Sequence, residues 1–424
     1  MKRAVLYFAL LFLTGCAVSG KKAFQKSFER EVQNGLFRNQ FTGLMVYDPQ
    51  SGDTLFTYNS HKYFIPASNT KIFTLYTALT LLPEQIPTLR YTLQNDSLFF
   101  ESTGDPVWLH PYFKDSTAIR FLENHQNVVW VPRPFANTPL GFGWAWEDYD
   151  SYYAPERSAL PLYGNVVQVI PKADSLQIVP EYFSSSIVQN KAFPYRRLQN
   201  SNLFNLPEAP KDTIEIPFVT GNSLTKKLLN AVLSKEISVA RKTNHKLDNV
   251  LYSIPADSLY KRMMHMSDNF LAEQVLLMAS GMLSDTLNGE VARVYMLENA
   301  LANLSQKPRW VDGSGLSRYN LFTPESVVSV LNELYKKYPQ EKRFTWFPAG
   351  GVSGTLENLY SGDHQPFVYA KSGTLSNNYC LSGYLLTDSG KTLIFSFMNN
   401  HFQESTGEVR RKIETFLEVI KKGF

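Results

Sequence analysis

A serine and a lysine three positions apart, in Ser68-Asn69-Thr70-Lys71, could serve as a nucleophile and its base. If a helix begins at Ser68, its unpaired N–H groups and positive dipole end would stabilise an alkoxide, and Lys71 would return to the same face. Burial of Lys71 beside another cation would lower its pKa enough for it to accept the Ser68 proton. The same spacing recurs elsewhere in the chain, so this pair alone does not define a site.

A second polar group, Ser267-Asp268-Asn269, interrupts a strongly apolar helical pattern. The serine hydroxyl could relay a proton, and the Asn269 amide could orient Lys71 and hold a substrate carbonyl. The plain alternative is a polar break between two helical halves.

A third group, Lys371-Ser372-Gly373-Thr374, follows a short apolar run that reads as an edge strand. A lysine at such an edge could bind a carboxylate, and Gly373 permits close approach of a ligand to the backbone. The Thr374 N–H could point at a carbonyl oxygen. The plain alternative is a β-turn with a solvated lysine.

The elements that must position these groups can be predicted from the spacing of apolar residues. Apolar side chains recur at helical spacing from Ile72 to Leu82, which predicts a buried helix beginning around Ser68. Residues 41–60 read as two strands around a turn, and residues 378–400 as a strand, a turn and a strand, followed by a helix over 407–422. Strands at both ends with helices between them predict one α/β domain whose sheet uses both ends of the chain.

The helices expected between these strands cover residues 224–237, a longer pattern over 256–283, and residues 323–338, where Thr323 is the expected N-cap. Residues 21–37 carry an apolar stripe and are also expected to be helical. The stretch from 88 to 225 differs, because it is rich in Pro, Tyr and Phe and in short strand-like runs. We expect a mostly β region inserted into the α/β domain; its strand-like runs are 93–100, 127–132, 165–171 and 174–180.

The N-terminus predicts export. Lys2 and Arg3 precede an apolar stretch, Ala4 to Leu13, which is too short to span a membrane comfortably and has the pattern of a secretory signal. The following Leu13-Thr14-Gly15-Cys16 resembles the lipobox of bacterial lipoproteins. That resemblance implies a signal peptide over 1–15, a lipid on Cys16, and a periplasmic protein anchored to a membrane, the outer membrane being favoured by Ala17. A plain signal peptide or an N-terminal anchor helix remains the alternative.

Bulk composition excludes several function classes. The 424 residues carry a formal charge of +4 and no basic tract, which argues against a nucleic-acid partner. The seven histidines are scattered without a metal-ligand spacing, so we predict no metal site and no cofactor. The second of the two cysteines, Cys380, lies in an apolar strand-like run, where a buried and inert thiol is expected.

Taken together and in this order, the three motifs are those of penicillin-binding proteins and class A β-lactamases. Longer stretches resemble the D-Ala-D-Ala carboxypeptidases of peptidase family S13: "YFIPASNTKIFTLYTAL", "STGDPVWL", "GWAWEDYDSYYAPERSALPL", "SDNFLAEQVLL", "WVDGSGLSRYN" and "AKSGTLSNNYCLSGYLLT". The resemblance implies a β-lactamase/transpeptidase-like α/β (α+β) fold, with an antiparallel sheet flanked by helices. In this division the catalytic domain comprises 39–87 and 226–424, the β-rich insertion 88–225, and a lipid-anchored lead-in 16–38.

The resemblance also implies roles for the motif residues. Ser68 would attack the carbonyl of the penultimate D-alanine of a peptidoglycan stem peptide, or a β-lactam, with Lys71 as base. Ser267 and Asn269 would line the site as proton relay and orienting amide. The terminal carboxylate would be bound by Lys371 and Ser372, and the oxyanion by the N–H groups of Ser68 and Thr374.

Two departures from the family pattern are visible. Ser372 stands where many members have threonine, which keeps the hydroxyl. The segment over 350–362, "GGVSGTLENLYSG", lacks an arginine expected after "GTL", which concerns the substrate loop and not the reaction.

Three alternatives stay open at this point. A β-lactamase or an esterase on the same scaffold would share acylation and differ in how fast water removes the acyl group. A class A β-lactamase needs an additional glutamate motif, which is not identifiable here. A noncatalytic lipoprotein could use the scaffold to bind wall peptides, and cleavage of crosslinked peptides by a DD-endopeptidase activity is a possible addition to carboxypeptidase activity.

Overall fold

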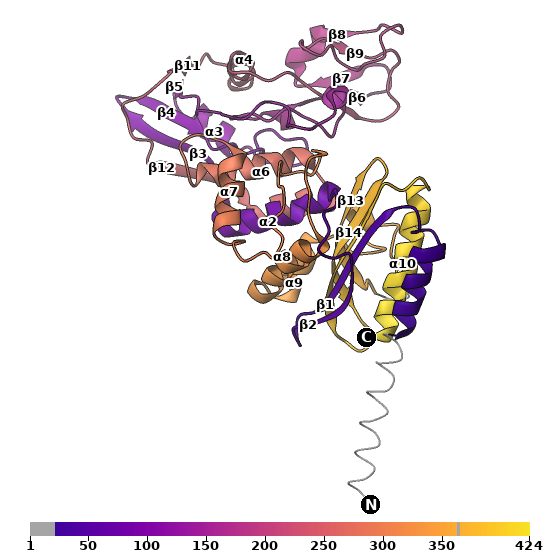
Figure 1. Cartoon of the computed structure of the whole chain (residues 1–424). Coiled ribbons are helices and arrows are strands. Elements are labelled where there is room, and N and C mark those ends of the chain that lie inside the picture. The colour runs from indigo at the N-terminus through magenta and orange to yellow at the C-terminus, as the bar shows by residue number, and fades with distance from the viewer. Residues whose placement is uncertain (1–21, 363–364) are drawn as a thin grey trace, which may run out of the picture.

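A five-stranded antiparallel sheet forms the centre of the molecule in the computed structural model, which describes residues 22–362 and 365–424 (Figure 1). Its order is β13-β14-β15-β1-β2. The strands are β1 (Phe41–Asp48), β2 (Asp53–Tyr58), β13 (Val368–Leu375), β14 (Asn378–Leu386) and β15 (Thr392–Asn400). Because β1 pairs with β15, the sheet joins both ends of the chain, which confirms the sequence prediction.

Two helices cover one face of this sheet. Residues 22–34 are helical, as predicted, and lie beside α10 (Thr406–Gly423) in Figure 1. Phe24 and Phe28 of the first helix contact Phe416 of the second with ring centroids 5.8 and 5.2 Å apart. The apolar stripe seen in the sequence therefore packs into the sheet's core, where burial of aromatic rings supplies the main stabilisation.

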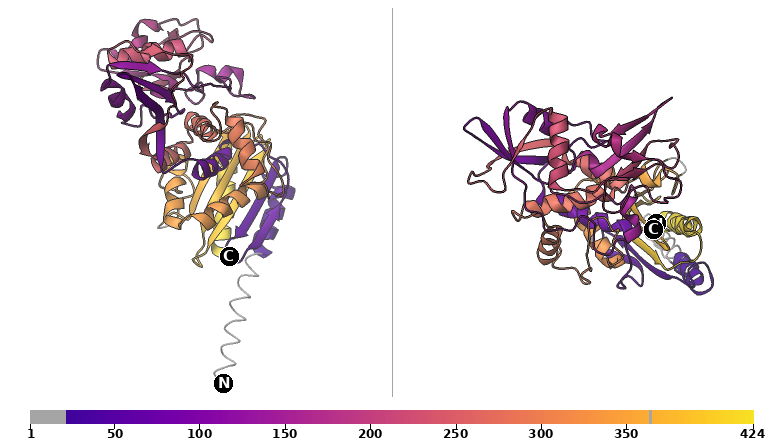
Figure 2. Two further views of the ribbon diagram at one scale, coloured as in Figure 1. Left: turned by 90° about the vertical axis from the view of Figure 1, so that its left-hand side faces the viewer. Right: turned by 90° about the horizontal axis from the view of Figure 1, so that it is seen from above.

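The remaining helices lie on the other face, towards the inserted region (Figure 2). They are α2 (Thr70–Leu81), α5 (Ala256–His265), α6 (Asn269–Gly281), α7 (Gly289–Glu298), α8 (Pro324–Lys337) and α9 (Gln340–Trp346). Thr323 caps α8 as predicted, because its hydroxyl accepts a hydrogen bond from the Ser326 N–H. Every residue of α2 from Thr70 to Ala78 is buried, as its continuous apolar pattern indicates.

The helical pattern over 256–283 forms two helices, α5 and α6, divided at the polar break that the sequence offered as the plain alternative for Ser267-Asp268-Asn269. The chain breaks at Ser267, whose φ of +55° lies in the left-handed region that a helix interior does not allow. Asp268 then caps α6 by accepting a hydrogen bond from the Leu271 N–H. The polar group thus ends one helix and starts the next.

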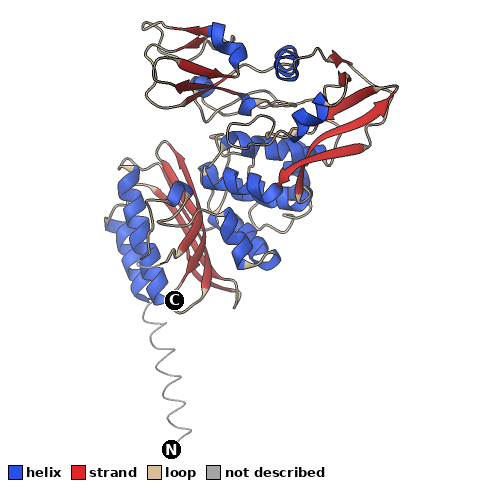
Figure 3. Ribbon diagram, turned by 180° about the vertical axis from the view of Figure 1, so that it is seen from behind, coloured by secondary structure: helices blue, strands red, loops and turns tan. Residues whose placement is uncertain are grey.

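The inserted region consists mainly of strands and loops (Figure 3). Its largest sheet has the order β11-β5-β4-β3-β12, and smaller sheets have the orders β10-β6-β7 and β8-β9. The elements are β3 (Gln85–Gln94), β4 (Ser97–Ser102), α3 (Thr117–Glu123), β5 (Asn127–Trp130), β6 (Val166–Pro171), β7 (Leu176–Val179), β8 (Ile187–Val188), β9 (Phe204–Asn205), β10 (Ile214–Pro217), α4 (Asn222–Leu233), β11 (Ser238–Val239) and β12 (Asn249–Pro255).

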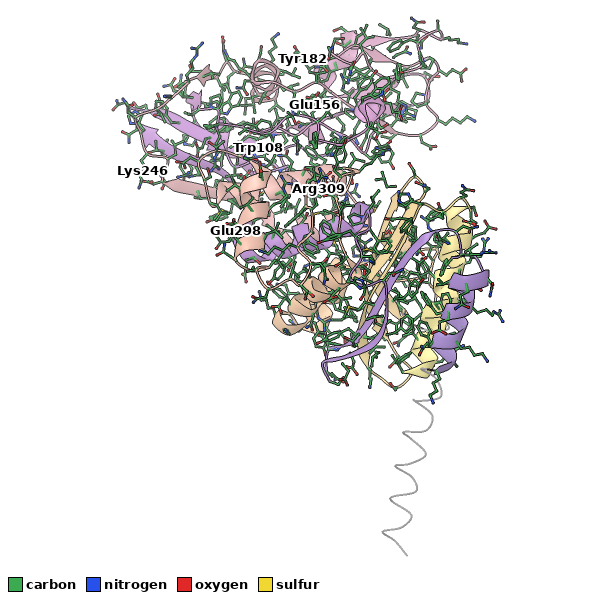
Figure 4. All side chains as sticks on the ribbon, viewed as in Figure 1. Trp108, Glu156, Tyr182, Lys246, Glu298 and Arg309 are labelled. Carbon is green, nitrogen blue, oxygen red and sulfur yellow. The ribbon has the colours of Figure 1, made fainter. Side chains whose placement is uncertain are left out.

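These sheets have their own apolar core, separate from the core around α2, and it includes Trp108, which is 2% exposed. Trp108 and Glu156 both lie above α6 in the view of Figure 4.

Of the strand-like runs predicted here, 93–100 is a hairpin, since Asn95 and Asp96 have positive φ between β3 and β4. Within the described residues, no helix is long and apolar enough to cross a membrane.

Candidate active site

Ser68 lies at the start of α2, in a 3-10 turn over Ala67–Asn69 (η1). This turn packs against β13 and β14, so the serine sits where the helical layer meets the edge of the central sheet. The Lys71 ammonium donates a hydrogen bond of 3.0 Å to Ser68 Oγ. The sequence prediction that Lys71 returns to the serine's side of the helix is confirmed.

Two further acceptors fix the Lys71 side chain, which is fully buried. Lys71 Nζ donates to Asn269 Oδ1 at 2.7 Å and to the Ser314 carbonyl at 2.7 Å. Asn269 is the first residue of α6, and its amide nitrogen donates to the Tyr153 carbonyl at 2.9 Å. The expected orienting role of Asn269 is therefore matched by a direct contact.

Burial lowers the pKa of Lys71 to about 8, although the nearby carboxylates of Asp312, Asp268 and Glu273 act in the opposite direction. A lysine with such a pKa is partly neutral near physiological pH and can accept a proton. The pKa of Lys371 is lowered well below its usual value by burial and by the charge of Lys71. Burial thus lowers the pKa of Lys71 as predicted, whereas repulsion between the two cations lowers the pKa of Lys371.

A tight loop that begins at Asp312 presents the Ser314 carbonyl to Lys71. The Asp312 carboxylate accepts hydrogen bonds from the N–H groups of Gly315 and Ser317, at 2.9 and 2.6 Å. It also accepts one of 2.9 Å from the indole N–H of Trp144, which belongs to the inserted region. The loop is therefore held by hydrogen bonds from its own backbone to Asp312, and Asp312 is held in turn by Trp144 of the inserted region.

Glu273 on α6 holds the same loop from the opposite end. Its Oε1 accepts from the N–H groups of Gly313 and Ser314 at 2.9 and 2.8 Å, and its Oε2 lies 3.2 Å from Arg157. Both side chains of this ion pair are buried. A buried pair of this kind is costly to break, so it ties the inserted region firmly to α6.

The third motif lies on β13, the edge strand of the sheet, as predicted. Lys371 is fully buried and donates to the Ser372 carbonyl at 2.7 Å. Gly373 allows η1 to approach, because a Cβ at this position would lie 2.8 Å from the Ser68 backbone nitrogen. The Ser372 hydroxyl donates to Thr355 Oγ1 at 2.7 Å, and Thr374 is exposed at the mouth of the site.

A cleft of about 730 Å³ opens over these elements. Five of the eight predicted catalytic and binding residues line it: Ser68, Ser267, Asn269, Ser372 and Thr374. The other three, Lys71, Lys371 and Gly373, lie beneath its surface and contact residues that line it. Among the hydrogen bonds of the described residues, Lys71 is joined to Asn269 and not to Ser267.

Several residues of the site were not assigned by sequence reasoning. Asp312 and Ser314 lie in "WVDGSGLSRYN", and Tyr153 lies in the inserted "GWAWEDYDSYYAPERSALPL", both of which were noted only for their family resemblance. Thr355 lies in the "GTL" segment noted for its missing arginine. A backbone carbonyl such as those of Ser314 and Tyr153 leaves no residue-type signal in a sequence.

The geometry suits covalent catalysis by a hydroxyl: a nucleophile at a helix start, a buried amine as base, and an amide that orients the amine. No group of three or more potential metal-ligating side chains occurs in the described ranges. Cys380 is buried as predicted, its pKa is raised by burial to about 12, and it donates to the Ile65 carbonyl. Cys16 and the signal peptide predicted over 1–15 lie outside the described residues.

Comparison with known proteins agrees with this geometry. The chain is 22% identical to the D-alanyl-D-alanine carboxypeptidase DacB of Haemophilus influenzae, over 87% of each chain. Its fold matches the crystal structure of penicillin-binding protein 4 (dacB) from Haemophilus influenzae with a TM-score of 0.72, at 20% identity over 92% of this chain and 98% of the other.

A predatory endopeptidase of Bdellovibrio bacteriovorus, in complex with an immunity protein, shares the fold with a TM-score of 0.52, at 18% identity over 89% of this chain and 94% of that one. The sequence profile of the D-Ala-D-Ala carboxypeptidase 3 (S13) family matches residues 24–192 and 215–420. These ranges include all three motifs and most of the inserted region. The chain therefore belongs to the D-Ala-D-Ala carboxypeptidase 3 (S13) family.

Proposed function

We propose that this enzyme is a serine-type D-Ala-D-Ala carboxypeptidase that cleaves peptidoglycan stem peptides through an acyl-enzyme on Ser68. The observation that carries the proposal is the 3.0 Å contact between Ser68 Oγ and Lys71, a lysine whose pKa burial lowers to about 8. The pair lies at the base of an open cleft beside the edge strand β13. Membership of the S13 family supports the same reaction.

In the first step, Lys71 accepts the hydroxyl proton while Ser68 Oγ attacks the carbonyl carbon of the penultimate D-alanine. The resulting oxyanion is bound by the backbone N–H groups of Ser68 and Thr374. The C–N bond then breaks, and the terminal D-alanine leaves after its nitrogen receives a proton relayed through Ser267. Water finally hydrolyses the acyl ester and restores the free hydroxyl.

The remaining motif residues position the substrate. Asn269 orients Lys71 and donates to the carbonyl of the residue before the scissile bond. Lys371, Ser372 and Thr374 form the end of the cleft that receives the terminal carboxylate, with Lys371 beneath the strand. Gly373 is required because its missing side chain lets β13 and the Ser68 turn approach each other.

We extend the proposal to β-lactams as inhibitors, since their ring amide presents the same carbonyl and a nearby carboxylate. A related crystal structure of penicillin-binding protein 4 from Haemophilus influenzae, with a TM-score of 0.65, is a complex with a β-lactam. Cleavage of crosslinked peptides as a DD-endopeptidase uses the same chemistry. The fold shared with a predatory endopeptidase favours this second activity.

We also propose that the chain is a lipoprotein that is exported by a signal peptide over 1–15 and anchored in the periplasm to a membrane, the outer membrane being favoured, through Cys16. The support is the basic start, the short apolar stretch and the "LTGC" sequence. In this scheme 16–38 leads from the anchor, and the sequence predicts a catalytic domain of 39–87 and 226–424 around an insertion of 88–225. We extend the insertion to residue 255, because β12 pairs with β3 and because α4 packs into the core of the inserted sheets. Metabolic labelling with a palmitate analogue, compared with Cys16→Ala, tests the anchor.

The activity itself is tested by D-alanine release from a pentapeptide ending in D-Ala-D-Ala, with wild type beside Ser68→Ala. Fluorescent penicillin measures acylation in the same samples. We expect release and labelling by wild type and neither by the variant. Labelling with rapid penicillin turnover but no D-alanine release would instead establish a β-lactamase, and binding of wall peptides without either activity would establish a noncatalytic protein.

A further inference from the structure

Arg410 of α10 reaches the active-site cleft, although it is far in sequence from all three motifs. Its side chain lines the cleft together with Ser372 and Thr374. One guanidinium nitrogen, Nη2, donates a hydrogen bond of 3.2 Å to Thr374 Oγ1. The C-terminal helix therefore supplies a cation at the end of the cleft formed by β13.

Among the described residues, the Arg410 guanidinium has a fixed position but no acidic partner at ion-pair distance. Its Cζ lies 4.9 Å from the ring centroid of Tyr379, which fixes the plane of the group by a cation–π contact. None of the ion pairs formed by the described residues includes Arg410. A preorganised arginine that lines a cleft and has no carboxylate partner is suited to an anionic ligand, since its fork of N–H groups matches a carboxylate.

The other cation of this end of the cleft is less accessible. Lys371 is fully buried, does not line the cleft, and donates to the Ser372 carbonyl. Its pKa is lowered by burial and by Lys71, which reduces its positive charge. A carboxylate that enters between the Ser372 and Thr374 hydroxyls would meet the exposed side of Arg410 before it could reach Lys371.

Two more arginines line the cleft, Arg262 and Arg318, and among the hydrogen bonds and ion pairs of the described residues neither side chain is joined to β13. Arg262 lies 3.9 Å from the Asp268 carboxylate, and its Cζ is 4.4 Å from the ring centroid of Tyr112. Arg318 follows the loop that holds Lys71, and its backbone N–H donates to the Gly143 carbonyl. Of the three, Arg410 is the one placed beside the hydroxyl groups of the third motif.

We propose that Arg410 binds the carboxylate of the residue after the scissile bond, and that it gives the enzyme its preference for peptides with a free carboxylate there. The inference rests on the proposed function, since it concerns the same cleft and the same leaving residue. Arg410 is a binding residue in this scheme and takes no part in proton transfer.

The test compares two substrates that differ only at this carboxylate: an acylated peptide ending in D-Ala-D-Ala, and the same peptide ending in D-alaninamide. The value of kcat/KM is measured for both with the full chain and with Arg410→Met, Arg410→Lys and Arg411→Met. Met keeps an aliphatic stem but lacks the guanidinium that lies over Tyr379, and thermal melting confirms that each variant is folded. Arg411 is the matched control, because it is exposed on the same helix and does not line the cleft.

We expect Arg410→Met to lower kcat/KM for the acid by roughly 10- to 100-fold, mainly through KM, and to leave the value for the amide unchanged. Arg410→Lys should retain part of the preference, and Arg411→Met should behave like wild type. Equal losses on acid and amide, or an unchanged preference in Arg410→Met, would overturn the inference. Loss of the preference in Arg318→Met with Arg410→Met unaffected would also overturn it.

Failure of the proposed function gives a different result. In that case wild type releases neither D-alanine from the acid nor D-alaninamide from the amide. If wild type is nevertheless acylated by penicillin, the same comparison is made with penicillin and its methyl ester. A loss of acylation by the acid alone in Arg410→Met then supports carboxylate binding by Arg410, and equal acylation by acid and ester in wild type contradicts it.

Discussion

Lys71 and Asn269 form the direct link between the two helices that build the active site, because Lys71 Nζ donates to Asn269 Oδ1 at 2.7 Å. The amide nitrogen of Asn269 is in turn bound to the Tyr153 carbonyl of the inserted region. The position of the base is therefore coupled to a segment more than a hundred residues away in sequence. Through Asn269, the inserted region therefore helps to position the base of Ser68.

Replacement of Asn269 by alanine should remove this link. We expect the second-order rate constant for acylation by penicillin to fall by about 10- to 100-fold, since a hydrogen bond to a charged amine is lost. Asn299→Ala is the matched control, because Asn299 is exposed directly after α7 and its side chain donates to the Tyr295 carbonyl of that helix. A normal acylation rate in Asn269→Ala would show that the contact does not orient Lys71.

The pKa of Lys71 predicts how acylation depends on pH. Because burial lowers this pKa to about 8, the neutral form that accepts the Ser68 proton increases as the pH rises through that value. The rate of acylation by a chromogenic β-lactam should rise with pH and level off above about 8. Asn269→Asp adds a negative charge beside the amine, so it should move the midpoint to higher pH. An acylation rate that stays the same from about pH 6 to about pH 9 would contradict the role of Lys71 as base.

Gly373→Ala tests the close approach of β13 to the Ser68 turn. The new Cβ would lie 2.8 Å from the Ser68 nitrogen and from the Pro66 carbonyl oxygen, closer than such contacts allow. Displacement of the turn should lower the acylation rate by about 10- to 100-fold, since overpacking costs about 1–3 kcal/mol. Gly407→Ala, where a Cβ meets nothing closer than 3.7 Å, should acylate like wild type. Equal rates for both variants would rule out the close approach as a requirement.

Arg157→Met should destabilise the fold, because it leaves the buried carboxylate of Glu273 without its partner. We expect a loss of about 3–5 kcal/mol in the free energy of unfolding, measured by urea denaturation. Lys246→Met breaks an exposed pair with Asp248 and should cost about 1 kcal/mol or less. Similar small losses for both variants would mean that the buried pair does not hold the insertion to α6.

Much of the site could be predicted because its key residues belong to short local motifs. Ser68 and Lys71 are one helical turn apart, and Lys371 to Thr374 are consecutive, so each motif can be found in the sequence, and their order together with the family resemblance indicated the site. One α/β domain followed from alternation in the terminal strands and from the apolar helix after Ser68, whereas the antiparallel transpeptidase-like fold was implied by the resemblance. These signals are local, and local periodicity is what a single sequence records most clearly.

The rest depends on contacts between distant segments or on the backbone. Lys71 bonds the carbonyl of Ser314, which any residue type could supply. The polar group at Ser267 suggested a break between two helical halves, but its residue type does not indicate the left-handed φ with which the chain leaves α5. Arg410 is one of several charged residues on α10, and only the packing of that helix brings it to Thr374.

The central claim is that Ser68 is the residue acylated, and peptide mapping of the penicillin adduct by mass spectrometry tests it most directly. The full chain is incubated with penicillin, digested, and searched for the added acyl mass. We predict one acyl group per chain, on the peptide that contains Ser68 and on no other, and none in Ser68→Ala. An unmodified Ser68 peptide in a fully labelled protein, or an adduct that persists in the variant, would contradict the account.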